Sequence, residues 1–378
     1  MREVLPELLK WWRRGDPIGM GTVVATWRSA PRPVGAAMLV GPGGEAIGSV
    51  SGGCVESAVY ELARKVVADG RPTLQRYGIS DDDAFGVGLP CGGMLDVFVE
   101  RVDRTTLPQL EEVTADIADG RAVAVCTLVK HPDAGRVGAH LVVRPQSASW
   151  TTVAGSLGSP RFDAAVADDA PGLLANGRSG ILTYGPDGER RGEGAQVFVA
   201  SHAPRPRMIV FGAIDFAAAL ARSGTFLGYR VTVCDARPLF ATRSRFPDAD
   251  EVVVDWPHRY LRAEIDAGRI DARTVLAVLT HDPKFDVPVL EIALRLPDVG
   301  YIGAMGSRRT HQDRLERLRA AGVSDAELAR LSSPIGLDLG ARTAEETAIS
   351  IAAEIIALRW GGQGDRLSQT RGAIHHRG

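Results

Sequence analysis

The chain has 378 residues, 45% of them hydrophobic and 24% charged, so it is long enough for two domains that each bury a core. Its formal charge of −2 gives no overall attraction to nucleic acid or to an anionic membrane, and we expect neither as a partner. Four cysteines without close pairs make neither a disulfide framework nor a paired-cysteine zinc motif, which favours a reducing cytoplasm.

The sequence pattern of the N-terminal half predicts short strands and helices that are separated by glycine and proline residues. Its N-terminal segment has leucines and a tryptophan at helical spacing, which predicts an amphipathic helix rather than a signal peptide. No apolar run is long enough to span a membrane. The predicted elements are a helix at 1–14, strands at 21–27, 36–40 and 46–50, a helix at about 54–69, a strand at 94–100, a helix at 110–118 and a strand at 122–129.

A different order begins after the segment Ser201–Pro206, which we interpret as a linker because prolines and polar residues interrupt the pattern there. The predicted strands beyond it are 208–211, 230–234, 251–254, 275–280 and 301–304, and the predicted helices are 216–227, 260–267, 287–296, 310–320 and 343–360. Strands that alternate with helices predict a parallel, doubly wound sheet.

The predicted fold class is therefore α/β. We expect an N-terminal mixed α/β domain with glycine- and cysteine-bearing loops at residues 1–203. A Rossmann-like doubly wound parallel-sheet domain is expected at 207–362, followed by a flexible tail at 363–378.

The first chemical motif is Ser51-Gly52-Gly53-Cys54, which opens a predicted helix. Glycines let the backbone approach a ligand, and a helix start offers unsatisfied N–H donors, so an anion could dock there. The positive end of the helix would also favour the thiolate form of Cys54. The alternative is a small residue that only closes a helix cap, and the sequence leaves both open.

Cys91 repeats this arrangement in Pro90-Cys91-Gly92-Gly93, where a thiol again stands beside a glycine pair. Both thiols are thus hypothetical sites for nucleophilic or metal-proximal chemistry. In contrast, Cys126 and Cys234 lie inside apolar strand patterns, for which packing in the core is the better explanation.

In the back half, Gly212 follows a strand and precedes a helix, the place of a dinucleotide fingerprint. The fingerprint is degraded, because Ile214 stands where a second glycine would let a pyrophosphate approach. Asp235 comes 23 positions after Gly212, suitably placed to accept a hydrogen bond from a ribose hydroxyl. A fold of this kind that has lost its dinucleotide remains equally open.

Two further loops fall where open α/β sheets bind ligands, and we expect both to face one crevice. Gly306-Ser307-Arg308 combines backbone donors with a guanidinium, which suits phosphate, although ordinary helix capping with solvated arginines is the alternative. His281 beside Asp282 suits a proton shuttle or a plain loop pair, and a ligand role is favoured. No P-loop motif occurs, so ATP would need an unconventional site.

Taken in order, eight segments of the chain resemble the XdhC/CoxI family of accessory factors for xanthine dehydrogenase and carbon-monoxide dehydrogenase. The segments are SAPRPVGAAM, GSVSGGCVE, VGLPCGG, VFGAIDFAAAL, DARPLFA, LTHDPKFD, YIGAMGSRRT and PIGLDLGART. The resemblance covers most of the chain.

The resemblance implies a cofactor-binding chaperone rather than a turnover enzyme. Such a factor binds molybdenum cofactor (molybdopterin), protects it while its terminal sulfur is installed, and delivers it to an apo molybdenum hydroxylase. A cysteine desulfurase is a candidate second partner, and the expected assembly is a homodimer.

Carried over by position, Cys54 and Cys91 fall on the family's glycine-flanked cysteines, where they could contact molybdenum, and Gly212 falls on its Rossmann glycine. The chain departs at Ile214-Asp215, where family members commonly have a Gly-His pair. The residues expected to contact the cofactor are Ser51, Gly52, Gly53, Gly92, Gly93, Gly212, Asp215, Asp235, His281, Asp282, Gly306, Ser307 and Arg308.

Two rival functions remain open from the sequence. One is an oxidoreductase that binds NAD(P) or FAD in the back domain, favoured by Asp235 and disfavoured by Ile214. The other is a nucleotide-binding or ATP-hydrolysing assembly factor.

Overall fold

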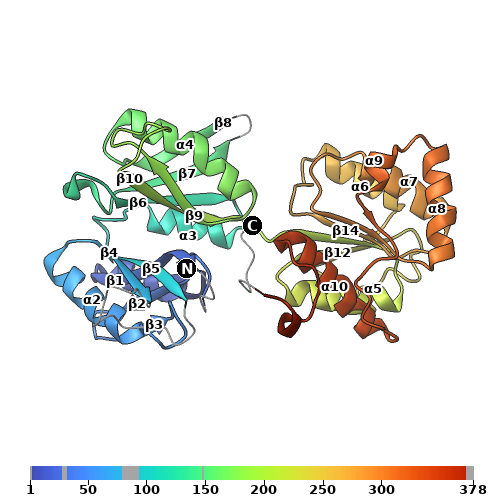
Figure 1. Ribbon diagram of the computed structural model, residues 1–378, viewed down its shortest axis with the longest axis horizontal. Helices are drawn as coiled ribbons and strands as arrows, with labels where there is room; N and C mark the ends of the chain where they lie inside the picture. Colours follow the sequence, from blue (N-terminus) through green and yellow to red (C-terminus); the bar gives the residue numbers. More distant parts are fainter. Residues whose placement is uncertain (1, 28–31, 79–92, 147–148, 372–378) are drawn as a thin grey trace. The chain divides into compact units, whose positions relative to one another are not determined.

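The computed structural model describes residues 2–27, 32–78, 93–146 and 149–371 (Figure 1). The chain divides into two compact units, with the front unit ending at Pro204 and the back unit beginning at Arg205. Each unit contains its own clusters of buried apolar side chains. No helix in the described ranges is both long and apolar enough to cross a membrane.

The front unit begins with a five-stranded sheet in the order β3-β2-β1-β5-β4, in which every neighbouring pair is antiparallel. Its strands are β1 (Ile18–Trp27), β2 (Ala37–Val40), β3 (Ala46–Gly48), β4 (Thr73–Gly78) and β5 (Met94–Val102). Helix α2 (Glu56–Asp69) packs Val59, Ala63 and Val66 against one face of this sheet. The N-terminal elements η1 (Arg2–Val4) and α1 (Leu5–Arg14) bury Trp11 and Trp12 in a neighbouring cluster.

A second five-stranded antiparallel sheet follows, in the order β8-β7-β6-β10-β9. Its strands are β6 (Val123–Lys130), β7 (His140–Gln146), β8 (Ser149–Gly155), β9 (Gly180–Tyr184) and β10 (Ala195–His202). Helix α4 (Pro160–Ala175) covers one face with Phe162 and Val166. The remaining front elements are α3 (Leu110–Ala118) and η2 (Ala134–Arg136).

The faces of the two front sheets that lie opposite α2 and α4 pack on each other, and α1 covers part of this face of the first sheet. Val24 and Phe98 of the first sheet share one buried cluster with Val125, Val129 and Phe198 of the second. Alternate residues of a strand point to opposite faces, so each sheet supplies one face to its helix and the other to this shared core.

The back unit is built on a six-stranded sheet in the order β13-β12-β11-β14-β15-β16, and every neighbouring pair is parallel. Its strands are β11 (Arg207–Phe211), β12 (Arg230–Asp235), β13 (Glu251–Val254), β14 (Val275–Val278), β15 (Tyr301–Ala304) and β16 (Leu331–Ser332). This order, numbered within the unit as 3-2-1-4-5-6, is that of a doubly wound Rossmann fold, which confirms the predicted fold class.

Helices cover both faces of the parallel sheet (Figure 1). Those on one face are α5 (Asp215–Phe226) and α10 (Ala344–Trp360), and those packed on the other are α6 (Pro257–Asp266), α7 (Pro283–Leu294) and α8 (Arg308–Ala320). The short elements α9 (Asp325–Leu328) and η3 (Leu367–Gln369) complete the unit. The chain reverses its winding between β11 and β14, and ligands of such sheets bind at the carboxyl ends of the strands at that point.

Most predicted elements are present with small shifts at their ends, and three differences matter. Ser201 and His202 belong to β10, where they pair with Ala124 and Val123, so the predicted linker shrinks to residues 203–206. Helix α2 begins at Glu56 rather than near Cys54. The short elements α9 and β16 were not predicted, because two to four residues carry no detectable periodicity.

Candidate functional site

The loop before α2 folds around a carboxylate of its own chain. Glu56 accepts hydrogen bonds from six donors, which are the backbone N–H groups of Val50, Ser51, Gly53 and Val55 and the hydroxyls of Ser49 and Ser51, at 2.5 to 3.2 Å. The hydroxyl of Ser51 in turn accepts from the N–H of Cys54 at 2.9 Å. Burial raises the pKa of Glu56, but the hydrogen bonds from Ser51 and Ser49 outweigh it and lower the pKa to about 2.

This arrangement corrects the expectation that the loop offers free donors to an external anion. The donors are present, as the glycines and the helix start suggested, but Glu56 already occupies them. Cys54 stands two residues before the helix and its side chain is exposed. The chemical group that this loop presents to solvent is therefore a thiol rather than an anion cradle.

Two of the other cysteines are buried in the core, as their strand contexts predicted. Cys126 and Cys234 are buried, and burial raises the pKa of the Cys126 thiol to about 12 and that of Cys234 further still. Both are consequently packing residues. Cys91 and Gly92 lie outside the described residues, while Gly93 is buried immediately before β5.

In the back unit, Gly212 lies at the reversal of the sheet with a φ of +115°. A Cβ atom at this position would approach the backbone nitrogen of Thr280 to 3.0 Å and the carbonyl carbon of Leu279 to 3.1 Å. Only glycine tolerates both the left-handed backbone and this contact. Gly212 thus brings the end of β11 directly against the end of β14.

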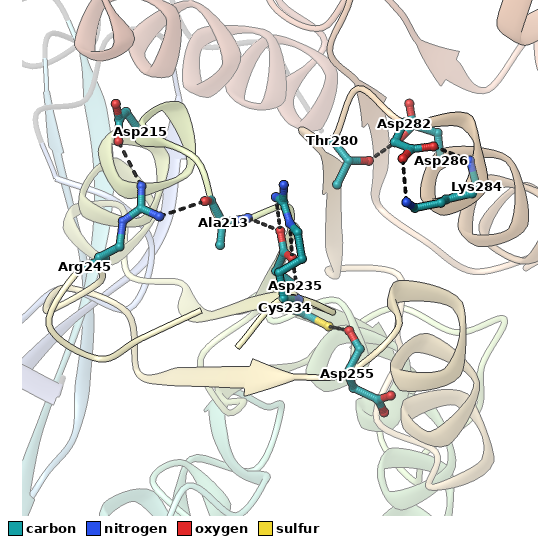
Figure 2. Close-up of polar contacts among 11 residues, drawn as sticks. Ala213, Asp215, Cys234, Asp235, Arg245, Asp255, Thr280, Asp282, Lys284 and Asp286 are labelled. Atoms are coloured by element: carbon teal, nitrogen blue, oxygen red, sulfur yellow. Dashed lines mark hydrogen bonds and ion pairs between the residues drawn. The ribbon is translucent and has the colours of Figure 1, made fainter. Parts of the chain in front are cut away.

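Asp235 ends β12 as predicted, but its carboxylate is fully engaged. Its Oδ2 atom accepts from the N–H of Ala213 at 2.7 Å (Figure 2). Both oxygens accept from the guanidinium of Arg237, at 2.8 and 2.9 Å. The side chain is only 2% exposed. Burial raises the pKa of Asp235, and the hydrogen bonds from Arg237 and Ala213 more than compensate, so the net shift is downward. A ribose hydroxyl would have to displace Arg237 to reach this carboxylate.

The helix start beside Gly212 carries no phosphate cradle of the usual kind. Ile214 caps α5 without a side-chain hydrogen bond, and Asp215 is 90% exposed in an ion pair with Arg245 at 3.2 Å (Figure 2). An acidic residue in the first turn stabilises a helix and repels a pyrophosphate. Asp215 and Ile214 therefore both oppose dinucleotide binding at this helix start.

The loop after β14 presents one buried and one exposed carboxylate. Asp286, buried in α7, accepts from the hydroxyl of Thr280 (Figure 2). It also accepts from Arg314 at 3.0 Å. Burial raises the pKa of Asp286 despite these bonds. Asp282 caps α7 and pairs with Lys284 at 2.9 Å, and its pKa is lowered chiefly by Lys284 and in part by Arg237, a residue of the β12 end. His281 is exposed next to Asp282.

The loop after β15 leads into two arginines whose side chains have no partner among the described residues. Ser307 caps α8 by accepting from the N–H of Thr310 at 3.1 Å, and Gly306 has a φ of +154°. Arg308 and Arg309 follow, both exposed, and no ion pair or hydrogen bond joins their side chains to any other described residue. Cations in a first helical turn are repelled by the helix dipole, and this turn holds no acidic residue. The start of α8 is therefore suited to an external anion.

The carboxyl ends of the parallel strands hence converge on one edge, where Gly212 meets Thr280 and the β15 loop joins β14 through a hydrogen bond from Met305 to Val278. The buried side chain of Arg314 links three elements at this edge. It donates hydrogen bonds to the carboxylate of Asp286, the carbonyl of Met305 and the hydroxyl of Ser333. In the described part of the chain, no three His, Cys, Asp or Glu side chains gather as a metal site. At this edge the described groups that are free to meet an anion are the exposed arginines at the start of α8.

Sequence reasoning missed the side chains that decide these loops, namely Glu56, Arg237 and Arg314. A signal existed for Glu56, because two serines followed by an acidic residue at a helix start resemble a capping motif. Arg237 lies two residues from Asp235, close enough to suggest a pair. Nothing in the sequence pointed to Arg314, whose position in α8 looks like that of any solvated arginine.

Two family models match the chain. The model described as the XdhC and CoxI family matches residues 11–78 and 116–185 in the front unit. The model described as the XdhC Rossmann domain matches residues 208–355, which span the parallel sheet from β11 into α10.

Relatives and a solved structure match over nearly the whole chain. A Bacillus subtilis protein, named as a probable subunit of xanthine dehydrogenase, is 30% identical over 344 residues, 90% of this chain and 92% of the relative. The Escherichia coli "molybdenum cofactor insertion chaperone PaoD" is 27% identical over 338 residues, 89% of this chain and 82% of that one. A Bacillus halodurans crystal structure, described as a xanthine dehydrogenase, is 26% identical with a TM-score of 0.64 and 97% of both chains covered. The chain belongs to the XdhC and CoxI family.

Proposed function

We propose that this chain is a maturation factor for a molybdenum hydroxylase of the xanthine or carbon-monoxide dehydrogenase type. It binds molybdenum cofactor as cargo, holds it during sulfuration and delivers it to the apo-enzyme. The observation that carries the proposal is the match to a molybdenum cofactor insertion chaperone along 89% of this chain, through both units.

The start of α8 supports a phosphate-bearing cargo. The cofactor's pterin carries a phosphate, and Arg308 with the first turn of α8 offers a charge and backbone donors that no described carboxylate occupies. Gly306 lets the backbone approach closely. The phosphate of the cargo would lie at this helix start.

Cys54 supports contact with the metal or with the transferred sulfur. Its thiol is exposed on a loop that Glu56 holds in place. Thiolates are soft ligands that suit molybdenum and sulfur chemistry. Cys91 is proposed for the same role from its position in the sequence alone.

The state of Asp235 supports a chaperone over a redox enzyme. A carboxylate that is held by Arg237 and Ala213 does not present itself to a ribose, and Ile214 obstructs a pyrophosphate. The second candidate function nevertheless remains NAD(P) or FAD binding, with ATP as a weaker rival. The strand order and Gly212 at the reversal of the sheet favour it.

The proposed partners are an apo molybdenum hydroxylase and, as sulfur donor, a cysteine desulfurase. We further propose that the chain forms a homodimer. We also propose that it works in the cytoplasm, because its four cysteines form no close pairs of the kind expected for disulfides.

The proposal is tested by reconstitution. Purified chain is loaded with molybdenum cofactor and mixed with apo xanthine dehydrogenase, and the recovered activity is compared with that produced by free cofactor plus an unrelated carrier protein. We expect faster and more complete activation from the loaded chain. Activation that equals the free-cofactor control would contradict the proposal.

A thermal-shift series separates the rival ligands. Selective binding to the folded state raises the melting temperature, so molybdenum cofactor, NAD, NADP, FAD and ATP are added one at a time. We expect stabilisation by molybdenum cofactor alone. Stabilisation by a dinucleotide instead would favour the second candidate.

A further inference from the structure

A cleft opens between the two sheets of the front unit, at the end where their shared core stops. Its volume is about 650 Å³, within the range of about 300–1,000 Å³ that small-molecule sites occupy. Its lining comes from β1, β4 and β5 of the first sheet and from β6, β9 and β10 of the second. No residue singled out by the glycine motifs lies in it.

The cleft exists because the facing side chains change character at matching positions in both sheets. In the first sheet the cross-strand pair Leu74–Phe98 is followed by the pair Arg76–Asp96. In the second sheet Ile181–Phe198 is followed by Thr183–Gln196. Each apolar pair contacts the shared core, whereas each polar pair lines the cleft. Bringing these polar pairs into contact would bury little apolar surface and would remove polar groups from water. No hydrophobic free energy therefore holds the two sheets together at this end, and they separate there.

Arg76 presents a flat cation whose orientation is fixed. Its Nε and Nη2 atoms donate to the two oxygens of Asp96 at 2.7 and 2.9 Å, and its guanidinium carbon lies 4.6 Å from the ring centre of Trp27. The guanidinium thus lies over an aromatic ring. The side chain is still 60% exposed and lines the cleft, so the side turned away from Trp27 and the Nη1 donors are available to a ligand.

The remaining polar lining supplies a positive charge and a hydrogen-bonding edge. Asp96 is neutralised by Arg76, while Lys130 is exposed and forms no ion pair with any other described residue. The net charge on the lining is therefore positive. Gln196 and Thr183 add an amide and a hydroxyl, which both donate and accept hydrogen bonds.

We propose that this cleft binds a planar heteroaromatic molecule that carries an anionic group. The ring stacks on the open face of Arg76, because guanidinium planes stack on aromatic rings. The anionic group pairs with Lys130, and the ring edge bonds to Gln196 and Thr183. The cleft belongs to the front unit, whereas the start of α8, which is proposed to hold the cargo's phosphate, belongs to the back unit.

The test uses pterin-6-carboxylate as the probe, with the full-length chain and fluorescence titration at neutral pH. Saturable binding is expected, with affinity lowered about tenfold by Lys130→Ala, which removes the charge. Arg76→Lys keeps the positive charge but removes the planar guanidinium, and we expect it to lower the affinity by a similar factor. Pterin without the carboxylate should bind more weakly to the unmodified chain and respond little to Lys130→Ala.

Arg64→Ala is the matched control. Arg64 is 62% exposed on α2, which covers the opposite face of the same sheet. Arg76→Lys would remove the paired hydrogen bonds to Asp96 and could prevent folding. In that case the affinity of Lys130→Ala alone tests the proposal, since Lys130 is exposed and has no partner among the described residues. No saturable binding by the unmodified chain, or equal affinities for Lys130→Ala and Arg64→Ala, overturns the proposal.

The same variants separate this inference from the proposed function. Pterin binding that depends on Lys130, in a chain that activates no apo-enzyme, supports the cleft and counts against the maturation role. Cofactor delivery without pterin binding in the cleft does the reverse.

Discussion

Two glycine-bearing loops lead into helices, Ser49–Val55 before α2 and Gly212–Ile214 before α5, and they differ in what they need glycine for. Gly52 and Gly53 have positive φ angles, and an added Cβ would meet nothing within 4 Å. Gly212 has a positive φ and also packs against the backbone of Thr280. In the front the glycines only bend the chain, whereas in the back the glycine permits two strand ends to touch.

The two loops also differ in how they handle charge. In the front, Glu56 accepts from six donors. In the back, Asp235 takes a single loop donor, Ala213, and uses the rest of its capacity on Arg237. A glycine-rich loop before a helix is therefore not enough to predict an anion site. What decides is whether the chain supplies its own anion, and at α8 no described residue does.

The largest expected effect comes from Gly212→Ala. A positive φ and a Cβ that would lie 3.0 Å from the nitrogen of Thr280 together should lower the free energy of unfolding by about 2–4 kcal/mol. Gly52→Ala carries only the backbone strain, about 1 kcal/mol. Urea denaturation of the two variants measures the difference. Equal losses would show that the contact with β14 does not matter.

The next effect concerns binding rather than stability. Arg308→Ala should weaken binding of a phosphate-bearing ligand by about 1.5–3 kcal/mol, the range for hydrogen bonds to charged groups. Calorimetry with the intact and the dephosphorylated cofactor measures it, and the loss should shrink without the phosphate. Arg317→Ala, also exposed but in the last turn of α8, is the control. A similar loss for both cofactor forms would assign Arg308 to the fold instead.

A pH-dependent effect should follow from Glu56→Gln. The pKa of Glu56 is lowered from 4.5 to about 2 in the folded chain, so the carboxylate stabilises the fold above pH 4.5 and this contribution fades as the pH falls toward 2. Because the group is only part-buried, we discount the shift for solvent screening and expect about 1–2 kcal/mol at pH 7. Denaturation at pH 7 and pH 3 checks this, with Glu61→Gln on the same helix as control. A loss that is as large at pH 3 would contradict the ionic origin.

The sequence located backbone features better than it located side-chain partners. Gly212 and Asp235 were placed correctly because alternating strands and helices fix where each strand ends. The occupation of the front loop by Glu56 depends on how the loop folds back, which no periodicity encodes. The cleft was invisible for a similar reason, since it requires the register that sets Arg76 opposite Asp96.

The smallest expected effects on stability come from replacing cysteines, and here the buried cysteines should differ most clearly in function from the cysteines of the glycine loops. Cys126→Ala and Cys234→Ala each leave a small cavity in a core and should cost about 1 kcal/mol while cofactor delivery persists. Cys54→Ala removes an exposed thiol, so stability should hardly change. Delivery of sulfurated cofactor should fall for Cys54→Ala and for Cys91→Ala, because both thiols are proposed to contact the metal or its sulfur. Reconstitution of the apo-enzyme and urea denaturation, run on the same four variants, measure both properties. If the double variant Cys54→Ala, Cys91→Ala activates the apo-enzyme at the unmodified rate, the thiols have no role in delivery.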